Sequence, residues 1–219
     1  MRRKDQTARR RQIVDAARQV LLERGAVGVR VKDIAERAGL APSSLLYYYP
    51  QLDGLLLEVS REAINRYGVS RADTVRGLRD PTDQLRLALH LGVPTGPDDK
   101  QSRLLYELDA FTGSSPAFAV LSASYFDRQV MLYESILDRG AARRKFRLAA
   151  AAETVARGLV ALEDGLGLQV VLGHPALDAT EAERVLVSHA GTVTATDLAS
   201  TPVTWPTSQD PRATGAETG

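Results

Sequence analysis

The sequence contains no cysteine, which excludes disulfides and thiolate metal sites. Its three histidines, His90, His174 and His189, form no H-x-x-x-H or E-x-x-H pair that would point to a catalytic metal. A glycine-rich phosphate loop, a G-x-S-x-G elbow and a dinucleotide-binding fingerprint are also missing. These absences argue against an enzyme, and we expect neither a metal nor a cofactor.

Long apolar runs are missing as well. No stretch approaches the roughly 18 uncharged apolar residues of a membrane span. The charged start MRRKDQTARRR is not followed by the apolar segment of a signal peptide. We therefore expect a cytoplasmic protein without membrane contact. The 219 residues are 44% hydrophobic and 25% charged, which is typical of a soluble globular chain with a core of its own.

The charge is small overall but unevenly distributed. Residues 1–49 hold 11 Lys and Arg against 5 Asp and Glu, a net charge of +6. Residues 50–219 hold 17 against 22, a net charge of −5, so the whole chain carries +1. A basic N-terminal part indicates contact with a polyanion such as nucleic acid, whereas the alternative is a merely solvated helix surface.

Nearly the whole chain shows the apolar spacing of helices, and alternating strand patterns are scarce. The pattern predicts an all-α protein of about nine helices. We place them at 7–24, 31–38, 42–49, 52 to about 71–78, 82–91, 101–111, 117–139, 148–172 and 180–198. Gly25 is well placed to end the first helix, and Pro42 is a favoured first residue for the third.

Three parts are expected from this pattern. Residues 1–51 form an N-terminal arm and a three-helix DNA-binding domain, and residues 52–198 form a helical domain for effector binding and dimerisation. Residues 199–219, rich in Thr, Pro, Ser and Gly, are expected to be a disordered tail.

The segment VKDIAERAGLAPSSLLYYYP, residues 31–50, carries the most specific pattern. A helix-turn-helix needs a small residue where its helices cross, a turn residue tolerant of positive φ, and an apolar anchor on the second helix. Ala35, Gly39 and Leu45 stand at these places. An isolated A-x-x-x-G is common in helical hairpins, but a basic arm and a three-helix unit accompany this one.

The predicted second helix of this motif has two faces. Leu45, Tyr48 and Tyr49 are expected to face inward or toward the helix edge, although such a tyrosine cluster is often simple packing. The opposite face can enter a major groove, where hydroxyls bond base edges or phosphates and Leu46 meets a thymine methyl. The basic arm can follow a phosphate track or a minor groove. The residues expected at DNA are Arg2, Arg3, Lys4, Arg30, Pro42, Ser43, Ser44, Leu46, Tyr47 and Tyr48.

Residues 23–59, from ERGAVG to GLLLEV, resemble the DNA-binding domain of TetR/AcrR-type repressors, and the similarity extends over about residues 6–59. The phrases RLLYELDAF (103–111) and ALEDGLGLQ (161–169) are similar to the branch that contains the choline-responsive regulator of the betaine pathway. The resemblance implies a homodimeric repressor of a DNA operator that a small-molecule effector releases.

The chain departs from that family at two places. Arg30 stands where a threonine usually caps the second helix, and since its side chain cannot accept an N–H, we expect it to reach a phosphate. Gln51 and Leu52 replace a common Ser-Lys pair, which removes one phosphate-binding cation. Tyr48 matches a position that often contacts the DNA backbone, and Tyr49 matches a core phenylalanine.

Dimerisation is expected to use the last two helices, which could form a four-helix interface with those of a second copy. The alternative is that both helices pack inside one subunit. The residues predicted at the interface are Val155, Leu159, Leu162, Leu166, Val185, Leu186 and His189.

The effector site is less well defined, because a generic apolar core would show the same pattern. The residues predicted to contact the effector are His90, Leu105, Asp109, Phe118, Tyr125 and Phe126. Asp109, Glu163 and Asp164 lie in apolar settings and could meet a cationic ligand, but the interpretation that we favour makes them solvated surface acids. A helical adaptor, or a constitutive DNA-binding protein without an effector, is the alternative function.

Overall fold

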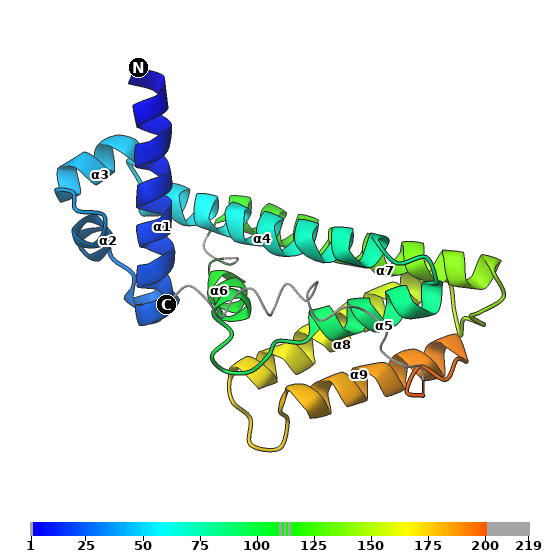
Figure 1. The fold of residues 1–219 in the computed structure, drawn as a ribbon. Helices are drawn as coiled ribbons and strands as arrows, with labels where there is room; N and C mark the ends of the chain where they lie inside the picture. The colour runs from blue at the N-terminus through cyan, green and yellow to red at the C-terminus, as the bar shows by residue number, and fades with distance from the viewer. Residues whose placement is uncertain (1, 110, 112, 114, 201–219) are drawn as a thin grey trace. The chain divides into compact units, whose positions relative to one another are not determined.

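The computed structural model describes residues 2–109, 111, 113 and 115–200. They form nine α-helices and no strand, which confirms the all-α prediction (Figure 1). The helices are α1 (Arg2–Gly28), α2 (Val31–Arg37), α3 (Pro42–Tyr48), α4 (Leu52–Arg76), α5 (Pro81–Gly92), α6 (Lys100–Asp109), α7 (Pro116–Ala142), α8 (Ala152–Val171) and α9 (Ala179–Thr194). The tail predicted at residues 199–219 falls almost wholly outside the described residues.

Helix α1 is longer than the predicted span of residues 7–24. It begins at Arg2, so the basic arm continues the helix. At Gly25 the backbone adopts φ 70° and ψ 173°, which interrupts the helical geometry before a last turn that ends at Gly28. The regular part of the helix thus ends at Gly25, as predicted. Glycine can interrupt the helix in this way because it adopts positive φ without a steric penalty.

The last two helices are shorter than predicted. Residues before Ala152 are not helical, because the Arg147 and Ala149 amides donate to the carbonyls of Thr194 and Val193. Helix α9 ends at Thr194, and the next residue, Ala195, has a left-handed φ of 49°. Long-range backbone pairing therefore replaces the helical turn predicted at 148–151, whereas residues 195–198 leave the helix through local turns, in which the Thr196 amide donates to the Gly191 carbonyl.

The chain forms two compact units. The first comprises residues 1–66 and 100–123, and the second comprises residues 67–99 and 124–219. These units do not follow the boundary expected at residues 51–52, because α6 packs against α1 in the first unit. The division into a DNA-binding and an effector-binding part remains a prediction about function.

Each unit has its own apolar core. In the first unit, Ile13, Leu21, Ile34 and Leu55 are completely or almost completely buried. In the second, α5, α7, α8 and α9 bury a larger cluster. That cluster includes Leu85, Leu89, Ile136, Leu159 and Leu186. Burying one such side chain contributes about 1.5–3 kcal/mol, so both units hold substantial cores.

Asp80 fixes the start of α5. Its Oδ1 accepts a 2.8 Å hydrogen bond from the Thr82 amide, and its Oδ2 pairs with the Lys145 ammonium. The hydrogen bond from Lys145 lowers the pKa of Asp80 below its usual value, against the opposing effect of partial burial. The charged form is thus favoured in the folded chain.

We expect Asp80→Ala to lower the free energy of unfolding by about 1–2 kcal/mol, because the cap is lost. Asp80→Asn keeps a capping oxygen but not the charge, and should lose less. Because the folded pKa is lowered, the stabilisation by the charge is present above the ordinary carboxyl pKa of about 4 and is lost as the pH falls below it. Urea unfolding of the three proteins at neutral and acidic pH measures this, and equal losses for Asn and Ala at neutral pH would contradict the capping role.

Candidate nucleic-acid interface and effector site

Helices α2 and α3 form a helix-turn-helix with the predicted contacts. Ala35 and Leu45 are fully buried, and Gly39 in the turn has a φ of +62°. The amides of Gly39 and Leu40 close this turn on the carbonyls of Glu36 and Ala35. The predicted roles of Ala35, Gly39 and Leu45 in the fold of the motif are therefore confirmed.

Polar contacts from α1 and α4 hold the motif in place. Gln12 donates to the Ala38 carbonyl at the end of α2, over 2.8 Å. At the end of α3, the Tyr49 hydroxyl donates to Glu58 Oε2 over 2.8 Å, and the Arg10 guanidinium lies 5.0 Å from the centre of the Tyr49 ring. Burial, together with the bond to Glu58, raises the pKa of Tyr49, so its hydroxyl remains a neutral donor. These contacts fix the orientation of α3 on α1.

The outer face of α3 is exposed as predicted. Ser43 and Ser44 are exposed, Leu46 is 40% exposed and Tyr47 is 76% exposed, whereas Tyr49 is buried. The Tyr47 ring meets the Tyr48 ring edge to face, with centroids 5.4 Å apart. A helix that presents hydroxyls and one apolar side chain to the surface has the composition that reads base edges.

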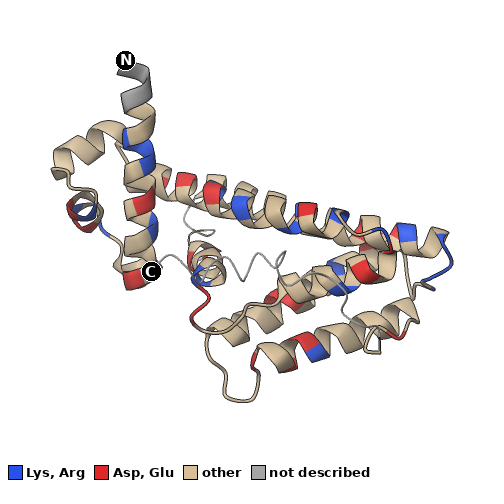
Figure 2. Ribbon diagram, in the orientation of Figure 1, with Lys and Arg blue, Asp and Glu red and all other residues tan. Residues whose placement is uncertain are grey.

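Basic residues accompany this face. Arg30 precedes α2 with an extended backbone and an exposed side chain that makes no capping bond, as expected. Arg9, Arg10 and Arg11 are exposed on α1, where Figure 2 shows Lys and Arg in blue. The side chains of Arg2, Arg3 and Lys4 lie outside the described residues, so their predicted role is not tested.

The residues predicted to bind an effector fall into different units. Leu105 and Phe118 pack in the core of the first unit, and the exposed Asp109 accepts a 3.5 Å hydrogen bond from Ser122 there. His90, Tyr125 and Phe126 belong to the second unit. His90 Nδ1 lies 2.8 Å from Glu183 Oε2, and Phe126 packs on the second core. No single unit brings all six residues together.

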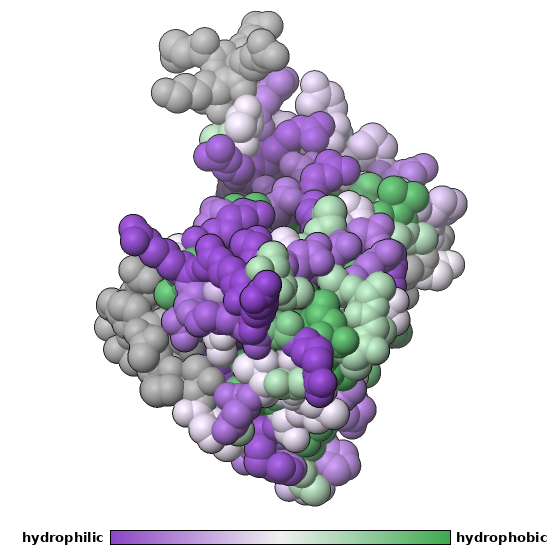
Figure 3. Space-filling model, turned by 90° about the vertical axis from the view of Figure 1, so that its right-hand side faces the viewer, coloured by the Kyte–Doolittle hydropathy of each residue, from purple (hydrophilic) through white to green (hydrophobic). Residues whose placement is uncertain are grey.

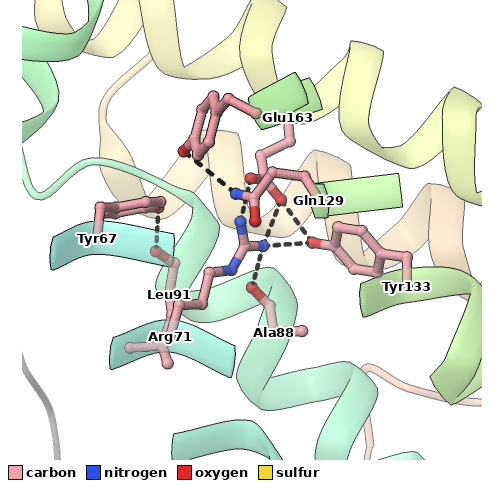
Figure 4. A network of polar contacts seen from close by, with 8 residues as sticks. Tyr67, Arg71, Ala88, Leu91, Gln129, Tyr133 and Glu163 are labelled. Carbon is pink, nitrogen blue, oxygen red and sulfur yellow. Dashed lines mark hydrogen bonds and ion pairs between the residues drawn. The ribbon is translucent and has the colours of Figure 1, made fainter. Parts of the chain in front are cut away.

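Sequence reasoning missed a buried polar cluster in the second unit (Figure 4). Arg71, 2% exposed on α4, makes two 2.7 Å contacts to the carboxylate of Glu163, 4% exposed on α8. Arg71 also donates to the Ala88 carbonyl and the Tyr133 hydroxyl. The interpretation of Glu163 as a solvated surface acid is therefore wrong. Its apolar surroundings in the sequence were the available signal, but they do not reveal a partner 92 residues away.

The charge states of this cluster follow from its geometry. Burial would lower the pKa of Arg71, but the Glu163 carboxylate outweighs it and raises that pKa well above the usual value. Burial raises the pKa of Tyr67 to about 12, and it also raises those of Tyr125 and Tyr133. The cluster therefore combines one guanidinium and one carboxylate with neutral tyrosines at physiological pH.

The residues predicted at the dimer interface are only in part accessible. Val155, Leu159 and Leu186 are buried in the core of their own chain, so we remove them from the proposed interface. Leu162, Leu166 and Val185 are half-buried, and His189 is exposed. Leu168 and Leu172 on α8 and its end are exposed too. On the face that Figure 3 shows, hydrophobic residues in green also reach the surface between hydrophilic ones.

Metal and membrane sites find no support in the part of the chain that the structure describes. No group of three or more His, Asp or Glu side chains there could hold a metal ion. None of its helices combines the length and apolar composition of a membrane span.

The described residues combine a braced helix-turn-helix with a second helical unit, an arrangement typical of DNA-binding regulators. The comparisons with known proteins identify the family. Residues 13–59 match the model of bacterial regulatory proteins of the tetR family, and residues 81–195, more than half of the chain, match the C-terminal model of BetI-type transcriptional repressors. The chain belongs to the TetR family, with a BetI-type C-terminal domain. This is a family of transcriptional regulators and not of enzymes.

Relatives and solved structures agree with this assignment. The chain is 27% identical over 173 residues to the regulator BetI of Escherichia coli O45:K1, covering 79% of this chain and 87% of BetI. It is 28% identical over 210 residues to the regulator PksA of Bacillus subtilis, covering 90% and 95%. A transcriptional regulator of Saccharomonospora viridis, solved in complex with choline, has a similar fold, with a TM-score of 0.76 at 24% identity over 82% of this chain and 94% of that one. A regulator from Haloarcula marismortui has a TM-score of 0.74 at 21% identity, over 85% and 98%.

Gly92, the last residue of α5, makes room for the Arg71–Glu163 pair. A Cβ at this position would lie 2.2 Å from Glu163 Cδ and 2.6 Å from an Arg71 terminal nitrogen. We expect Gly92→Ala to lower the free energy of unfolding by about 1–3 kcal/mol, the usual cost of overpacking. Thermal and urea unfolding measure the loss.

Gly54→Ala on α4 is the matched control, because its added Cβ meets nothing within 4 Å. It should leave the stability unchanged or raise it by up to about 1 kcal/mol. Equal effects of the two substitutions would show that the pair does not depend on the missing Cβ.

Proposed function

We propose that this chain is a repressor that binds a palindromic or pseudo-palindromic DNA operator as a homodimer and is released by a small-molecule effector. The observation that carries the proposal is the exposed face of α3, with Ser43, Leu46 and Tyr47 directed away from the core on a motif fixed to α1. Such a rigid outer face is what a recognition helix needs in a major groove.

The DNA contacts that we propose divide by chemistry. Ser43, Leu46 and Tyr47 read base edges, while Arg30 and Tyr48 bind phosphates. Pro42 and Ser44 lie at the start of α3, close to the DNA backbone. The arm residues Arg2, Arg3 and Lys4 add affinity for any duplex, since cationic side chains displace counterions without reading sequence.

The proposed dimer places two α3 helices about 34–36 Å apart, one turn of DNA. Leu162, Leu166, Val185 and His189 would meet their counterparts across a two-fold axis. The partial exposure of Leu162, Leu166 and Val185 and the exposure of His189 support this arrangement.

The effector is proposed to bind within the second unit, at the parts of α5, α7 and α8 that belong to it, and to act on α3 through two chain connections. Three residues separate the end of α3 from the start of helix α4, which is unbroken to Arg76. Helix α6 contacts α1, where Glu107 Oε2 accepts a 2.7 Å hydrogen bond from the Ala26 amide next to the Gly25 kink. Coupling of about 1–3 kcal/mol between effector and operator would suffice for release. An organic cation like the choline bound by the Saccharomonospora viridis regulator is one candidate class, and a neutral or anionic molecule is the other.

Selection from random DNA duplexes tests the function directly. We expect one enriched two-fold sequence, bound by two chains, with log affinity falling steeply as log salt rises because bound Lys and Arg release counterions. Enrichment of no sequence would favour the adaptor alternative. An operator that no metabolite releases would favour the constitutive one.

Ser43→Ala and Tyr47→Phe test the reading face. Each removes one hydroxyl from an exposed side chain, so thermal stability should not change. Affinity for the selected operator should fall about tenfold, equivalent to about 1.4 kcal/mol, with relaxed preference at particular base pairs. Leu45→Ala is the contrasting variant, because a buried leucine lost from the motif costs about 2–5 kcal/mol of stability. Unchanged affinity and preference in both hydroxyl variants would place the reading face elsewhere.

A further inference from the structure

The protein holds the guanidinium of Arg71 as a binding site holds an organic cation (Figure 4). Both oxygens of Glu163 contact it at 2.7 Å, and the Ala88 carbonyl accepts a third hydrogen bond at 2.7 Å. The centre of the Tyr133 ring lies 5.4 Å from the guanidinium carbon, within the range of a cation–π interaction. A carboxylate, a carbonyl and an aromatic ring are the groups that bind organic cations in proteins.

In the described part of the second unit, this cluster leaves no buried carboxylate without a cationic partner. Among the described residues, Glu163 is the only acidic side chain that is fully buried, and Arg71 and Tyr133 occupy its oxygens. The aromatic neighbours have partners too, since Tyr67 donates to the Leu91 carbonyl over 2.8 Å and Gln129 donates to the Tyr125 hydroxyl over 3.2 Å.

We propose that Arg71 is a built-in occupant of this cation-binding cluster, so that the effector of this chain is a neutral or anionic molecule and not a quaternary ammonium. The existence of an effector rests on the proposed function, whereas the occupancy of the cluster does not. The residue thus determines the ligand specificity of the second unit.

Two physical effects exclude a second cation. A free cation would have to displace the Arg71 guanidinium, which is tethered to the chain. The effective concentration of this tethered group at Glu163 is far higher than the concentration of a free cation in solution. A cation beside Arg71 would be repelled by a like charge in a poorly solvated interior. A ligand at this place instead meets Arg71 Nε, a buried donor without an acceptor among the described residues, which favours ligands that carry acceptor oxygens.

Thermal unfolding of the full chain tests the occupancy, with millimolar tetramethylammonium or guanidinium chloride compared with sodium chloride at equal ionic strength. The wild-type melting temperature should not respond to either cation. Arg71→Ala removes the guanidinium and leaves Glu163 without a cationic partner, so the melting temperature of this variant should be lower than that of the wild type. Added cation should then raise the melting temperature of the variant until the site is saturated. The apparent cation affinity of this variant should exceed that of the wild type at least about tenfold.

Two controls isolate the carboxylate. The double variant Arg71→Ala/Glu163→Gln has the same space but no charge, and cations should not stabilise it. Arg66→Ala removes an exposed arginine from the same helix and should behave as the wild type.

Two results would overturn the inference. One is a folded Arg71→Ala variant that no cation stabilises. The other is saturable one-site binding of tetramethylammonium to the wild type in titration calorimetry, which decides the matter even if the variant does not fold. Operator binding is measured separately on the wild type: a chain that binds no operator refutes the proposed function and leaves the cation result standing.

Discussion

A guanidinium and a carboxylate that leave water together can do so only if nearly every hydrogen-bonding group finds a partner, and Arg71 and Glu163 meet this constraint through α4, α5, α7 and α8 at once. The desolvation of each ion costs several kcal/mol, and the pair, the Ala88 carbonyl and the Tyr133 hydroxyl offset it. Well-packed apolar residues could give similar stability. We therefore expect the pair to act mainly by selecting one conformation of the second unit. It fixes one arrangement of four helices, and it requires a residue without a Cβ at Gly92.

Polar contacts between helices also fix the arrangement of the first unit. Arg10, Tyr49 and Glu58 join α1, the end of α3 and α4, so α3 cannot turn on α1 without breaking buried or half-buried contacts. Arg71 and Glu58 stand on one continuous helix. A regulator needs such stiff elements, because an effector can change DNA affinity only by favouring one of a few discrete arrangements.

The sequence predicted the helices and the reading face well, because both depend on local patterns. Apolar spacing located all nine helices of the described residues, and the positions of Ala35, Gly39 and Leu45 defined the turn. Helix ends were less predictable where distant backbone groups decide them, as at Arg147 and Ala149, which pair with the end of α9. The division of the chain also differed, since α6 packs on α1 rather than within the second unit.

Sequence alone thus determined the fold class, the family resemblance and the outward face of α3, since periodicity, turn chemistry and motif spacing are written in consecutive residues. Only the tertiary structure decided that Glu163 is buried, that Arg71 neutralises it, and that Val155, Leu159 and Leu186 belong to the core of their own chain. The physical reason is that a charged or apolar side chain on a helix has the same local pattern whether it faces water, a partner or the interior. Its environment depends on side chains far away in the sequence, here 92 residues for Arg71 and Glu163.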